Sequence, residues 1–412
     1  MKDSRIIFHI DFDSYFVSAH RSKNTNLKNW PVAVSKDLDN SICTSISYEL
    51  KNLGIKVGWP KYMIIKKAPK TIFVKPDFTL YTTISNNIFD YLSKKYTKNI
   101  EVSSIDECWM DVTDVLKGLD PVVFARKIQY DVLKKFDIPI SIGISHTKWA
   151  AKISSDLAKP FGVKYVNTQS ELENYIWPLD IIDYYGIGEK TAIRLRKIGI
   201  KTISNLARSS ALDVDLYKIF KSRLKNYIDE ANGNGSDKLE YSHNELKNIG
   251  HELTFAKYNI DDRHEIHKII KDLVIKVCHR AKNRNIIGST LTIVIKNTTK
   301  SWTSKQKKIS KPSNDENFIY NSAINLFDEY WNEQPIKGVG VRLTNLIDEF
   351  NYYKQLSIFE NDHEKSQKIA VNDIINHINL NQEKEILKTG YQVLREKTKK
   401  SIQNRFLEED VH

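Results

Sequence analysis

Cysteine is scarce in this chain, and long apolar runs are missing. The three cysteines, Cys43, Cys108 and Cys278, stand far apart and form no CxxC pair. This spacing supports neither a disulfide framework nor a thiolate zinc site, and it suits a reducing compartment. The first apolar run, at residues 6–10, is far too short for a signal peptide or a membrane span. We therefore expect a cytoplasmic protein that does not bind a membrane.

The length and composition indicate a folded protein with several domains. At roughly 150 residues per domain, a chain of 412 residues corresponds to about three domains. Apolar residues make up 41% and charged residues 28% of the chain, which is ordinary for globular proteins. This balance is unlike that of a largely disordered chain, so we expect most of it to fold.

Positive charge is concentrated in one part of the chain. The net charge is +12, and residues 247–311 hold fifteen Lys or Arg against five Asp or Glu, a difference of +10. Because neutralised phosphates release condensed counterions, such a segment is typical of a surface that binds a nucleic-acid backbone. The alternative is a solvated lysine face on a protein that is rich in Lys and Asn.

The order of predicted elements over the first 166 residues is that of a ferredoxin-like sheet. A strand, a helix, a hairpin of two strands, a helix, a strand and a helix are expected at residues 6–12, 13–21, 100–112, 121–136, 138–144 and 148–159. In this split arrangement the first strand lies beside the hairpin. Asp11 at the end of the first strand should therefore lie next to Asp106 and Glu107 in the hairpin.

The rest of the chain divides into further segments. Residues 26–77 interrupt the sheet pattern and indicate a small inserted subdomain, and the pattern becomes helical after residue 167. The run Asn-Gly-Asn-Gly-Ser at residues 232–236 is typical of a flexible linker. A new α+β domain should begin near Tyr241, and from residue 349 onward Asn, Lys and Glu dominate a tail that we expect to be partly ordered.

The three converging carboxylates predict a magnesium site. Like charges at adjacent strand ends raise one another's pKa unless a positive charge lies among them. Carboxylate oxygens are the ligands that Mg²⁺ prefers in phosphoryl-transfer sites, and two such ions about 4 Å apart can activate a hydroxyl and stabilise a leaving pyrophosphate. The alternative is that Asp11 and Asp13 are a helix cap and a surface residue.

Two other patterns indicate contacts with phosphate. Lys148, Lys152 and Lys159 share one face of a predicted helix, although a solvated lysine stripe would look the same. Gly186 and Gly188 form a Gly-x-Gly turn that lets backbone N–H groups approach a phosphate. Such a turn can also be a mere tight connection between helices.

Four ordered blocks resemble the Y-family DNA polymerases, the DinB and UmuC group of translesion enzymes, over about residues 6–346. The blocks are DFDSYF from Asp11, SSIDECWMD from Ser103, GISHTKWAAKISSDLAKP from Gly143 and YGIGEKTAIRLRKIGIKTISNLA from Tyr185. The last block is similar to the family's helix-hairpin-helix.

The resemblance implies an α+β multidomain fold and an activity. The fold would comprise a ferredoxin-like palm, small fingers, a helical helix-hairpin-helix thumb, an α+β little finger that binds DNA, and a tail, at residues 1–25 with 78–166, 26–77, 167–236, 241–348 and 349–412. The activity would be low-fidelity, template-directed translesion DNA synthesis without proofreading. Its substrates would be primer–template DNA and deoxynucleoside triphosphates, and the enzyme would be a monomer.

The resemblance also implies a set of catalytic residues. Asp11 and Asp106 would bind two Mg²⁺ ions together with the Phe12 carbonyl, and Glu107 would complete the carboxylates. Phe16 would be a steric gate that rejects the 2′ hydroxyl of ribonucleotides by clash. The alternative for Phe16 is a core residue of an amphipathic helix.

Further residues are assigned to substrates by the same resemblance. Ser45, Tyr48, Lys51 and Lys159 fall where the family holds the triphosphate, with Lys51 in place of the usual Arg. Because Arg grips phosphate with a planar fork and Lys offers a point charge, this replacement bears on nucleotide affinity. In the thumb turn, the residues expected to contact DNA are Gly186, Gly188 and Lys190.

A short segment near the tail resembles the clamp-binding peptide of bacterial members. It consists of Gln355, Leu356, Ser357, Ile358 and Phe359. An extended peptide with Leu and Phe anchors can fill a pocket on a sliding clamp and raise the local concentration of DNA. We therefore expect a sliding clamp as a partner.

Two other functions remain in view. A catalytically silent, clamp-recruited DNA-binding scaffold would tolerate loss of Asp11, Asp106 or Glu107, yet all three are present. A palm-type nucleotide cyclase would leave the thumb turn and the basic domain without a substrate to hold. The polymerase is therefore the function that the sequence favours.

Overall fold

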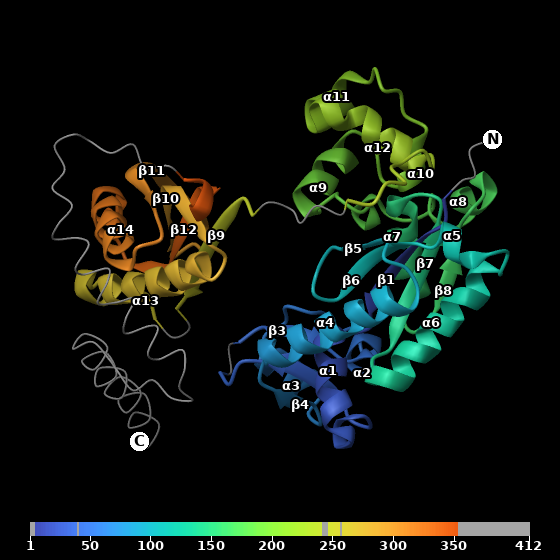
Figure 1. The fold of residues 1–412 in the computed structure, drawn as a ribbon. Coiled ribbons are helices and arrows are strands. Elements are labelled where there is room, and N and C mark those ends of the chain that lie inside the picture. The colour runs from blue at the N-terminus through green and yellow to red at the C-terminus, as the bar shows by residue number, and fades with distance from the viewer. Residues whose placement is uncertain (1–4, 39–40, 241–245, 256–257, 353–412) are drawn as a thin grey trace.

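The computed structural model describes residues 5–38, 41–240, 246–255 and 258–352. Figure 1 shows an N-terminal part, which ends with the helices around α12, and a C-terminal α+β domain that begins with β9. The N-terminal part contains a central sheet, a small second sheet and a group of helices.

The central sheet has five strands in the order β5-β6-β1-β7-β8. These strands are β1 Ile7–Phe12, β5 Ile100–Val102, β6 Glu107–Asp111, β7 Ile140–Ser145 and β8 Val163–Tyr165. The first strand is antiparallel to both β6 and β7, so it lies between the hairpin and the later strand. The ferredoxin-like arrangement predicted from the sequence is confirmed.

Alternate residues of β1 point to opposite faces of this sheet, as the period of a strand requires. Phe8, Ile10 and Phe12 are buried in the core that the sheet shares with three helices. Those helices are α1 Tyr15–Lys23, α4 Phe78–Lys95 and α6 Pro121–Phe136. On the other face His9 contacts α7, Lys148–Ala158, through Ser155. The face that carries His9 therefore also carries Asp11.

Gly143 allows α7 to lie directly on β7. A Cβ atom at Gly143 would stand 2.0 Å from the carbonyl oxygen of Ala151 and 2.2 Å from the backbone nitrogen of Ser155. Real Cβ atoms do not approach backbone atoms this closely, so any other residue would push the helix away. The position of α7 on the sheet therefore depends on this glycine.

The inserted segment forms a small sheet in the order β3-β2-β4, with β2 and β4 parallel and β2 and β3 antiparallel. Its elements are η1 Thr25–Leu27, β2 Val32–Ser35, β3 Cys43–Ile46, α2 Tyr48–Asn52, α3 Lys61–Lys67 and β4 Ile72–Val74. A small core around Cys43, Ile46, Leu50 and Ile64 holds it together. A short helix, α5 Thr113–Leu116, follows β6 in the main sheet.

The helical region packs against α7, the helix that lies on the main sheet. Its elements are α8 Gln169–Tyr175, η2 Ile181–Asp183, α9 Glu189–Lys197, α10 Ile203–Ala207, α11 Val214–Phe220, η3 Lys221–Arg223 and α12 Leu224–Ala231. Trp149, Ala150 and Ile153 of α7 belong to the same buried cluster as these helices. The helical region is therefore attached to the sheet through α7.

The segment after α12 lies on the sheet and does not form the free linker that was predicted at residues 232–236. The backbone nitrogen of Lys148 donates to the Ser236 carbonyl at 3.0 Å, and that of Glu240 donates to Glu101 Oε2 at 2.7 Å. Leu239 is buried in a cluster with Trp109. These contacts hold a sequence that composition alone would leave flexible.

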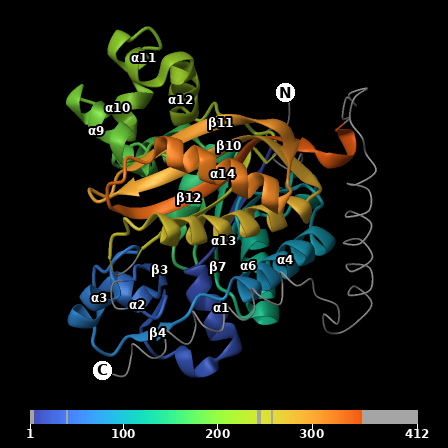
Figure 2. The same ribbon diagram turned by 90° about the vertical axis from the view of Figure 1, so that its left-hand side faces the viewer.

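The C-terminal domain is a four-stranded antiparallel sheet in the order β11-β10-β12-β9, covered on one face by two helices. Its elements are β9 Asn248–Thr254, α13 Arg263–Lys282, β10 Ile286–Asn297, β11 Trp302–Ser313, α14 Glu316–Tyr330, β12 Ile336–Asp348 and η4 Glu349–Asn351. Figure 2 shows α13 and α14 running along the sheet.

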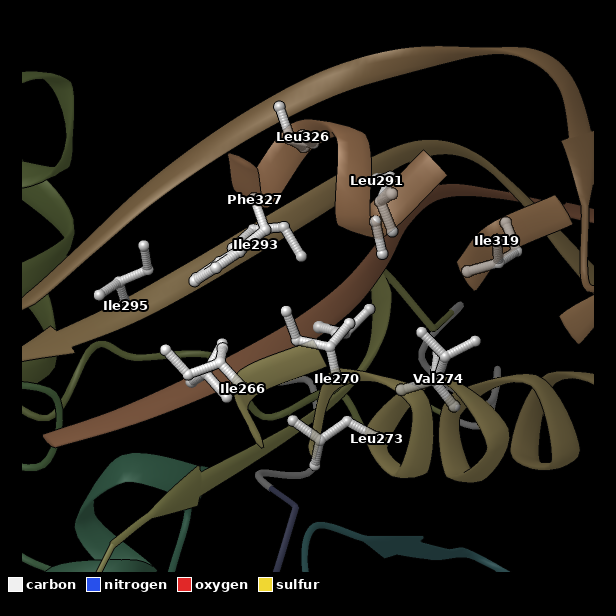
Figure 3. Close-up of a cluster of buried hydrophobic side chains, with 14 of the residues drawn as sticks. Ile266, Ile270, Leu273, Val274, Leu291, Ile293, Ile295, Ile319, Leu326 and Phe327 are labelled. Carbon is white, nitrogen blue, oxygen red and sulfur yellow. The ribbon is translucent and has the colours of Figure 1, made fainter. Parts of the chain in front are cut away.

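Apolar residues from both helices and from β10 fill the space between them. Figure 3 shows Ile266, Ile270 and Val274 of α13 facing Ile293 of β10 and Phe327 of α14, all of which are buried. Fully burying one such side chain stabilises a fold by about 1.5–3 kcal/mol. Because the helices cover one face of the sheet, only the opposite face is open to other contacts.

The described ranges contain no helix that is long and apolar enough to cross a membrane. Cys43, Cys108 and Cys278 are all buried and free of disulfides. Burial raises the pKa of each thiol, so the three cysteines stay neutral and pack as small apolar side chains.

Candidate active site

The structure brings the three predicted carboxylates to neighbouring strand ends. Asp11 is the direct antiparallel partner of Glu107 across β1 and β6. The Phe12 nitrogen donates to the Asp106 carbonyl at 2.9 Å, so Asp106 follows at the same edge. Directly opposite residues in such a ladder have Cα atoms about 4.5–5.5 Å apart and side chains on one face. The side chains of Asp11 and Glu107 therefore leave the sheet on the face covered by α7.

The lysines of α7 form ion pairs with acidic residues of the sheet. Lys159 Nζ lies 2.9 Å from Asp11 Oδ2, and Lys152 Nζ contacts Glu107 Oε2. Lys148 pairs in the same way with a glutamate of β5 at 2.6 Å. The sequence analysis offered this lysine stripe as a phosphate-binding or solvated face, but in the structure it faces carboxylates. Lysines thus supply the compensating charge that was expected from magnesium.

The environment gives Asp11 and Glu107 different protonation behaviour. Burial raises the pKa of Asp11 to about 6, although Lys159 acts against the rise. Burial also acts to raise the pKa of Glu107, but His9 and Lys152 outweigh it and hold that pKa at about 2. Glu107 is therefore ionised throughout the physiological range, whereas Asp11 depends more on a nearby cation.

His9 is a functional neighbour that the sequence analysis missed. It is buried under the carboxylates, with Nδ1 2.7 Å from Ser155 Oγ and Nε2 3.6 Å from Glu107 Oε2. Burial lowers the pKa of His9, which favours the neutral ring. The alternation of Ile7, His9 and Asp11 along β1 was the signal that could have placed His9 beside the site.

The donor set fits a hard divalent cation. Asp11, Asp106, Glu107 and the Phe12 carbonyl offer only oxygen atoms, which Mg²⁺ prefers. Within the part of the chain that the structure describes, no three His, Cys, Asp or Glu side chains are already grouped to hold a metal. In this structure Lys159 and Lys152 instead donate to Asp11 and Glu107.

Asp13 is neither the helix cap nor the surface residue that the sequence alternative suggested. It is only 1% exposed, and the N-cap of α1 is Ser14, in a left-handed conformation with φ 44°. The Asp13 carboxylate accepts hydrogen bonds from Ser141 Oγ at 2.9 Å, Tyr48 Oη at 3.0 Å and the Phe161 nitrogen at 2.8 Å. It thereby joins the sheet, the inserted subdomain and the loop after α7.

The residues predicted to hold a triphosphate lie around Asp13. Tyr48 and Lys51 are on α2, and Lys51 Nζ stands 4.2 Å from the Tyr48 ring centroid. Burial lowers the pKa of Lys51, and the charge of Lys159 lowers it further. Among the described residues Lys51 has no ion pair within 4 Å. Ser45 is buried on β3. The charges of Lys51 and Lys159 therefore act on one another, and an anion near both would offset this repulsion.

Phe16 lies where the inserted subdomain meets the main sheet. Its ring packs against the core of the main sheet and against the small cluster around Val32 and Val34. It stacks on Tyr81 with ring centroids 4.2 Å apart. Phe16 remains partly exposed, so the packing around it does not enclose the residue completely.

The predicted Gly-x-Gly turn precedes α9. Gly186 has φ +107°, which favours glycine. Gly188 is the N-cap of α9, and nothing lies within 4 Å of a Cβ built on it, so its backbone can be approached closely. Lys190 follows as an exposed residue in the first turn of α9. Tyr185, just before the turn, has its ring centroid 4.9 Å from Lys152 Nζ.

The basic cluster of residues 247–311 is divided between two faces of the C-terminal sheet. Leu291 and Ile293 point toward the helices, so their cross-strand partners Lys307 and Lys305 lie on that side. Lys308 lies on the opposite face, because its partner Thr290 alternates with Leu291.

The predicted clamp-binding residues Gln355, Leu356, Ile358 and Phe359 lie outside the described residues.

Comparison with known proteins gives matches along most of the chain. A sequence model of the impB/mucB/samB family matches residues 10–156, and the model of that family's C-terminal domain matches residues 246–358. The IMS family HHH motif matches residues 170–200. The three matched segments coincide with the main sheet and inserted subdomain, the C-terminal domain and the helical region.

Individual proteins show the same relationship. The DNA polymerase IV of Oceanobacillus iheyensis is 33% identical over 372 residues, which cover 89% of this chain and 87% of that protein. The DNA polymerase IV of Bacillus velezensis is 31% identical over 96% of this chain and 95% of its own length. Among solved structures, a Y-family DNA polymerase chimera of Dbh and Dpo4 superposes with a TM-score of 0.73 at 28% identity, over 83% of this chain and 99% of the chimera.

Proposed function

The chain belongs to the impB/mucB/samB family of DinB-like Y-family DNA polymerases, and from this premise we propose how its own residues carry out the reaction. The protein is a DNA-directed DNA polymerase that performs translesion DNA synthesis. It acts on DNA and nucleotide substrates and depends on divalent metal. A catalytically silent scaffold is not favoured.

In the proposed site, Asp11, Asp106 and the Phe12 carbonyl hold two Mg²⁺ ions, and Glu107 completes the carboxylates. The observation that carries this assignment is the direct pairing of Asp11 with Glu107, with Asp106 hydrogen-bonded next to them. When bound, the ions would activate the primer 3′ hydroxyl and stabilise the departing pyrophosphate. The carboxylates must first give up Lys159 and Lys152.

The triphosphate supplies the anion that these lysines lack once the carboxylates bind metal. Lys159 Nζ pairs with both Asp11 and Asp156, and its charge acts on Lys51, so these two lysines would hold the phosphates together. Ser45 would donate its hydroxyl near the same phosphates, and Tyr48 would line the site with its one hydroxyl hydrogen already donated to Asp13. Because the Asp13 carboxylate holds the Tyr48 hydroxyl, this side chain is oriented before nucleotide binds.

Phe16 is the proposed steric gate. Its ring would lie under the sugar of the incoming nucleotide and exclude a 2′ hydroxyl by overlap. Support comes from its place on α1, five residues after Asp11 and at the junction with the subdomain that carries Tyr48. A core residue would be buried all round, whereas Phe16 is partly exposed.

The proposed architecture assigns names to the parts of the fold. The palm is residues 1–25 and 78–166, the fingers 26–77, the thumb 167–236 and the little finger 241–348, with a tail at 349–412. In the thumb, Gly186, Gly188 and Lys190 would contact a DNA phosphate through the open backbone at Gly188. The enzyme would act as a cytoplasmic monomer, and its tail peptide would bind a sliding clamp.

The carboxylate mechanism is tested by primer extension with Asp106→Ala in Mg²⁺. We expect a loss of at least about a thousandfold, roughly 4 kcal/mol of barrier. Asp114→Ala, which removes an exposed aspartate of α5, is the matched control and should extend normally. DNA binding by fluorescence anisotropy should be retained in both variants. Near-normal extension by purified Asp106→Ala would remove the mechanism.

The clamp assignment has its own test. Deleting Gln355 to Phe359 should leave synthesis without a clamp intact, because these residues follow the last strand of the C-terminal domain. Stimulation by an added sliding clamp should disappear. Persistent stimulation by the clamp would refute the role of this peptide.

A further inference from the structure

Tyr81 is held by α1 at two points. Its ring stacks on Phe16 with centroids 4.2 Å apart and planes only 9° from parallel. Its hydroxyl lies 2.8 Å from Nε2 of His20, which follows Phe16 by four residues and thus shares its face of the helix. Tyr81 itself is 0% exposed. Helix α1 therefore contacts both the ring face of Tyr81, through Phe16, and its hydroxyl, through His20.

The surroundings leave Tyr81 little room to shift. Phe78 meets the rings of both Phe16 and Tyr81 edge-on, at 5.9 and 5.7 Å between centroids. The Tyr15 hydroxyl donates to the Tyr81 carbonyl. The hydroxyl end of Tyr81 is held by the His20 side chain, and the Asp77 backbone is its second hydrogen-bond partner.

The direction of the hydrogen bond between His20 and Tyr81 follows from the state of the imidazole. Burial lowers the pKa of His20, which favours the neutral ring, and the ring also donates to the backbone of Lys75. A neutral ring with one nitrogen donating has the other free to accept. Nε2 therefore accepts from the Tyr81 hydroxyl and ties α4 to α1 and to the end of the fingers.

An aromatic ring excludes a ribonucleotide by steric clash only if the residues packed behind the ring keep it from moving back. A ring that can retreat by about 1 Å no longer clashes, and displacements of that size can change a rate about a hundredfold. Phe16 has Tyr81 directly behind it as a parallel surface. If Tyr81 can slide, Phe16 can follow it, because stacked rings keep their contact.

We propose that His20 is a positioning residue for sugar selection: by fixing the hydroxyl of Tyr81 it keeps the ring of Phe16 in place against the incoming sugar. The proposal rests on the proposed role of Phe16 as the steric gate and adds the residue that holds the gate. It assigns to His20 an effect on the choice between ribo- and deoxyribonucleotides, and none on the metal ligands.

The experiment measures kcat/KM for a deoxynucleotide and for the matching ribonucleotide on one primer–template, and takes their ratio. His20→Leu and Tyr81→Phe each remove one partner of the hydrogen bond and should lower the ratio about five- to thirtyfold. His20→Gln, which keeps an acceptor, should retain most of the selectivity. The double variant His20→Leu/Tyr81→Phe should lose no more than either single variant, since both remove the same interaction.

Tyr96→Phe is the matched control. It also removes a tyrosine hydroxyl from the α4 segment, but that hydroxyl contacts Asp131, away from the gate. Because the ratio compares two substrates on the same enzyme preparation, a general loss of folded protein does not change it. Tyr96→Phe should therefore keep the wild-type ratio.

Phe16→Ala distinguishes failure of the steric-gate assignment for Phe16 from failure of the proposed role of His20. If Phe16→Ala admits ribonucleotides while His20→Leu and Tyr81→Phe keep the wild-type ratio, the gate stands and the role of His20 is overturned. If Phe16→Ala itself leaves sugar selection unchanged, the gate assignment fails and the role of His20 fails with it. A fall in the ratio for Tyr96→Phe equal to that for Tyr81→Phe would also overturn the role of His20.

Discussion

Replacing Asp13 by alanine should destabilise the protein and weaken nucleotide binding together. The buried carboxylate receives hydrogen bonds from Ser141, Tyr48 and the Phe161 backbone. A buried donor left without a partner costs about 1–3 kcal/mol. Ser141 is fully buried, whereas the Tyr48 and Phe161 donors are only partly buried and can turn to water. The expected loss is therefore about 3–5 kcal/mol, near the lower bound for three donors.

The effect on function follows from where the donors lie. Tyr48 is on α2 of the inserted subdomain, and the Phe161 nitrogen is two residues beyond Lys159. Without the carboxylate between them, the two sides of the proposed triphosphate site lose a shared support. We expect KM for the deoxynucleotide to rise about tenfold, equivalent to 1.4 kcal/mol.

Thermal unfolding and steady-state primer extension measure the two effects of Asp13→Ala. At about 2–4 °C per kcal/mol for a unit of 150–250 residues, the midpoint should fall by about 10 °C. Asp13→Asn keeps one acceptor oxygen and should lie between wild type and Asp13→Ala. Asp90→Ala, at an exposed site on α4, should be neutral. A midpoint within about 2 °C of wild type, with an unchanged KM, would show that the buried carboxylate does not support these donors.

Three further changes test other parts of the structure. Gly143→Ala should cost about 3 kcal/mol or more in unfolding experiments, because a Cβ would meet backbone atoms of α7 at 2.0 Å, whereas Gly188→Ala, with nothing within 4 Å, should be tolerated. Lys51→Arg should lower KM for the nucleotide about threefold through a planar fork on phosphate, and an equal or higher KM would contradict the placement of Lys51. Burial raises the pKa of Glu230 despite the Tyr184 hydrogen bond, so the folded protein binds the proton more tightly and stability falls as pH rises through that pKa. Glu230→Gln should be the more stable form at pH 8 and match wild type near pH 4, and a difference that does not change with pH would contradict this reasoning.

The path of the main sheet could be predicted because its signals are local. Apolar runs, the helix stop at Pro160 and the order of strands placed Asp11 beside Glu107, and the structure pairs them directly. The helical spacing of Lys152 and Lys159 was also visible. Their partners were not, because a period shows which residues share a face and leaves open what that face meets.

Asp13 shows why part of the site escaped the sequence analysis. Its donors Tyr48, Ser141 and Phe161 are 35, 128 and 148 residues away along the chain. No local pattern joins such residues, so a carboxylate between a strand and a helix looks like a cap. The segment at residues 232–236 was misjudged for a similar reason, since Leu239 and Glu240 attach it to distant parts of the sheet.

The close packing of α7 on β7 at Gly143 limits how this part of the enzyme can move. The helix cannot slide over the strand without collision, so the backbone of α7, which carries Lys152, keeps its place on β7, next to the strand that carries Asp11. Any rearrangement in this region must then take place outside the contact between α7 and β7, and a side chain at position 143 would disturb both elements at once.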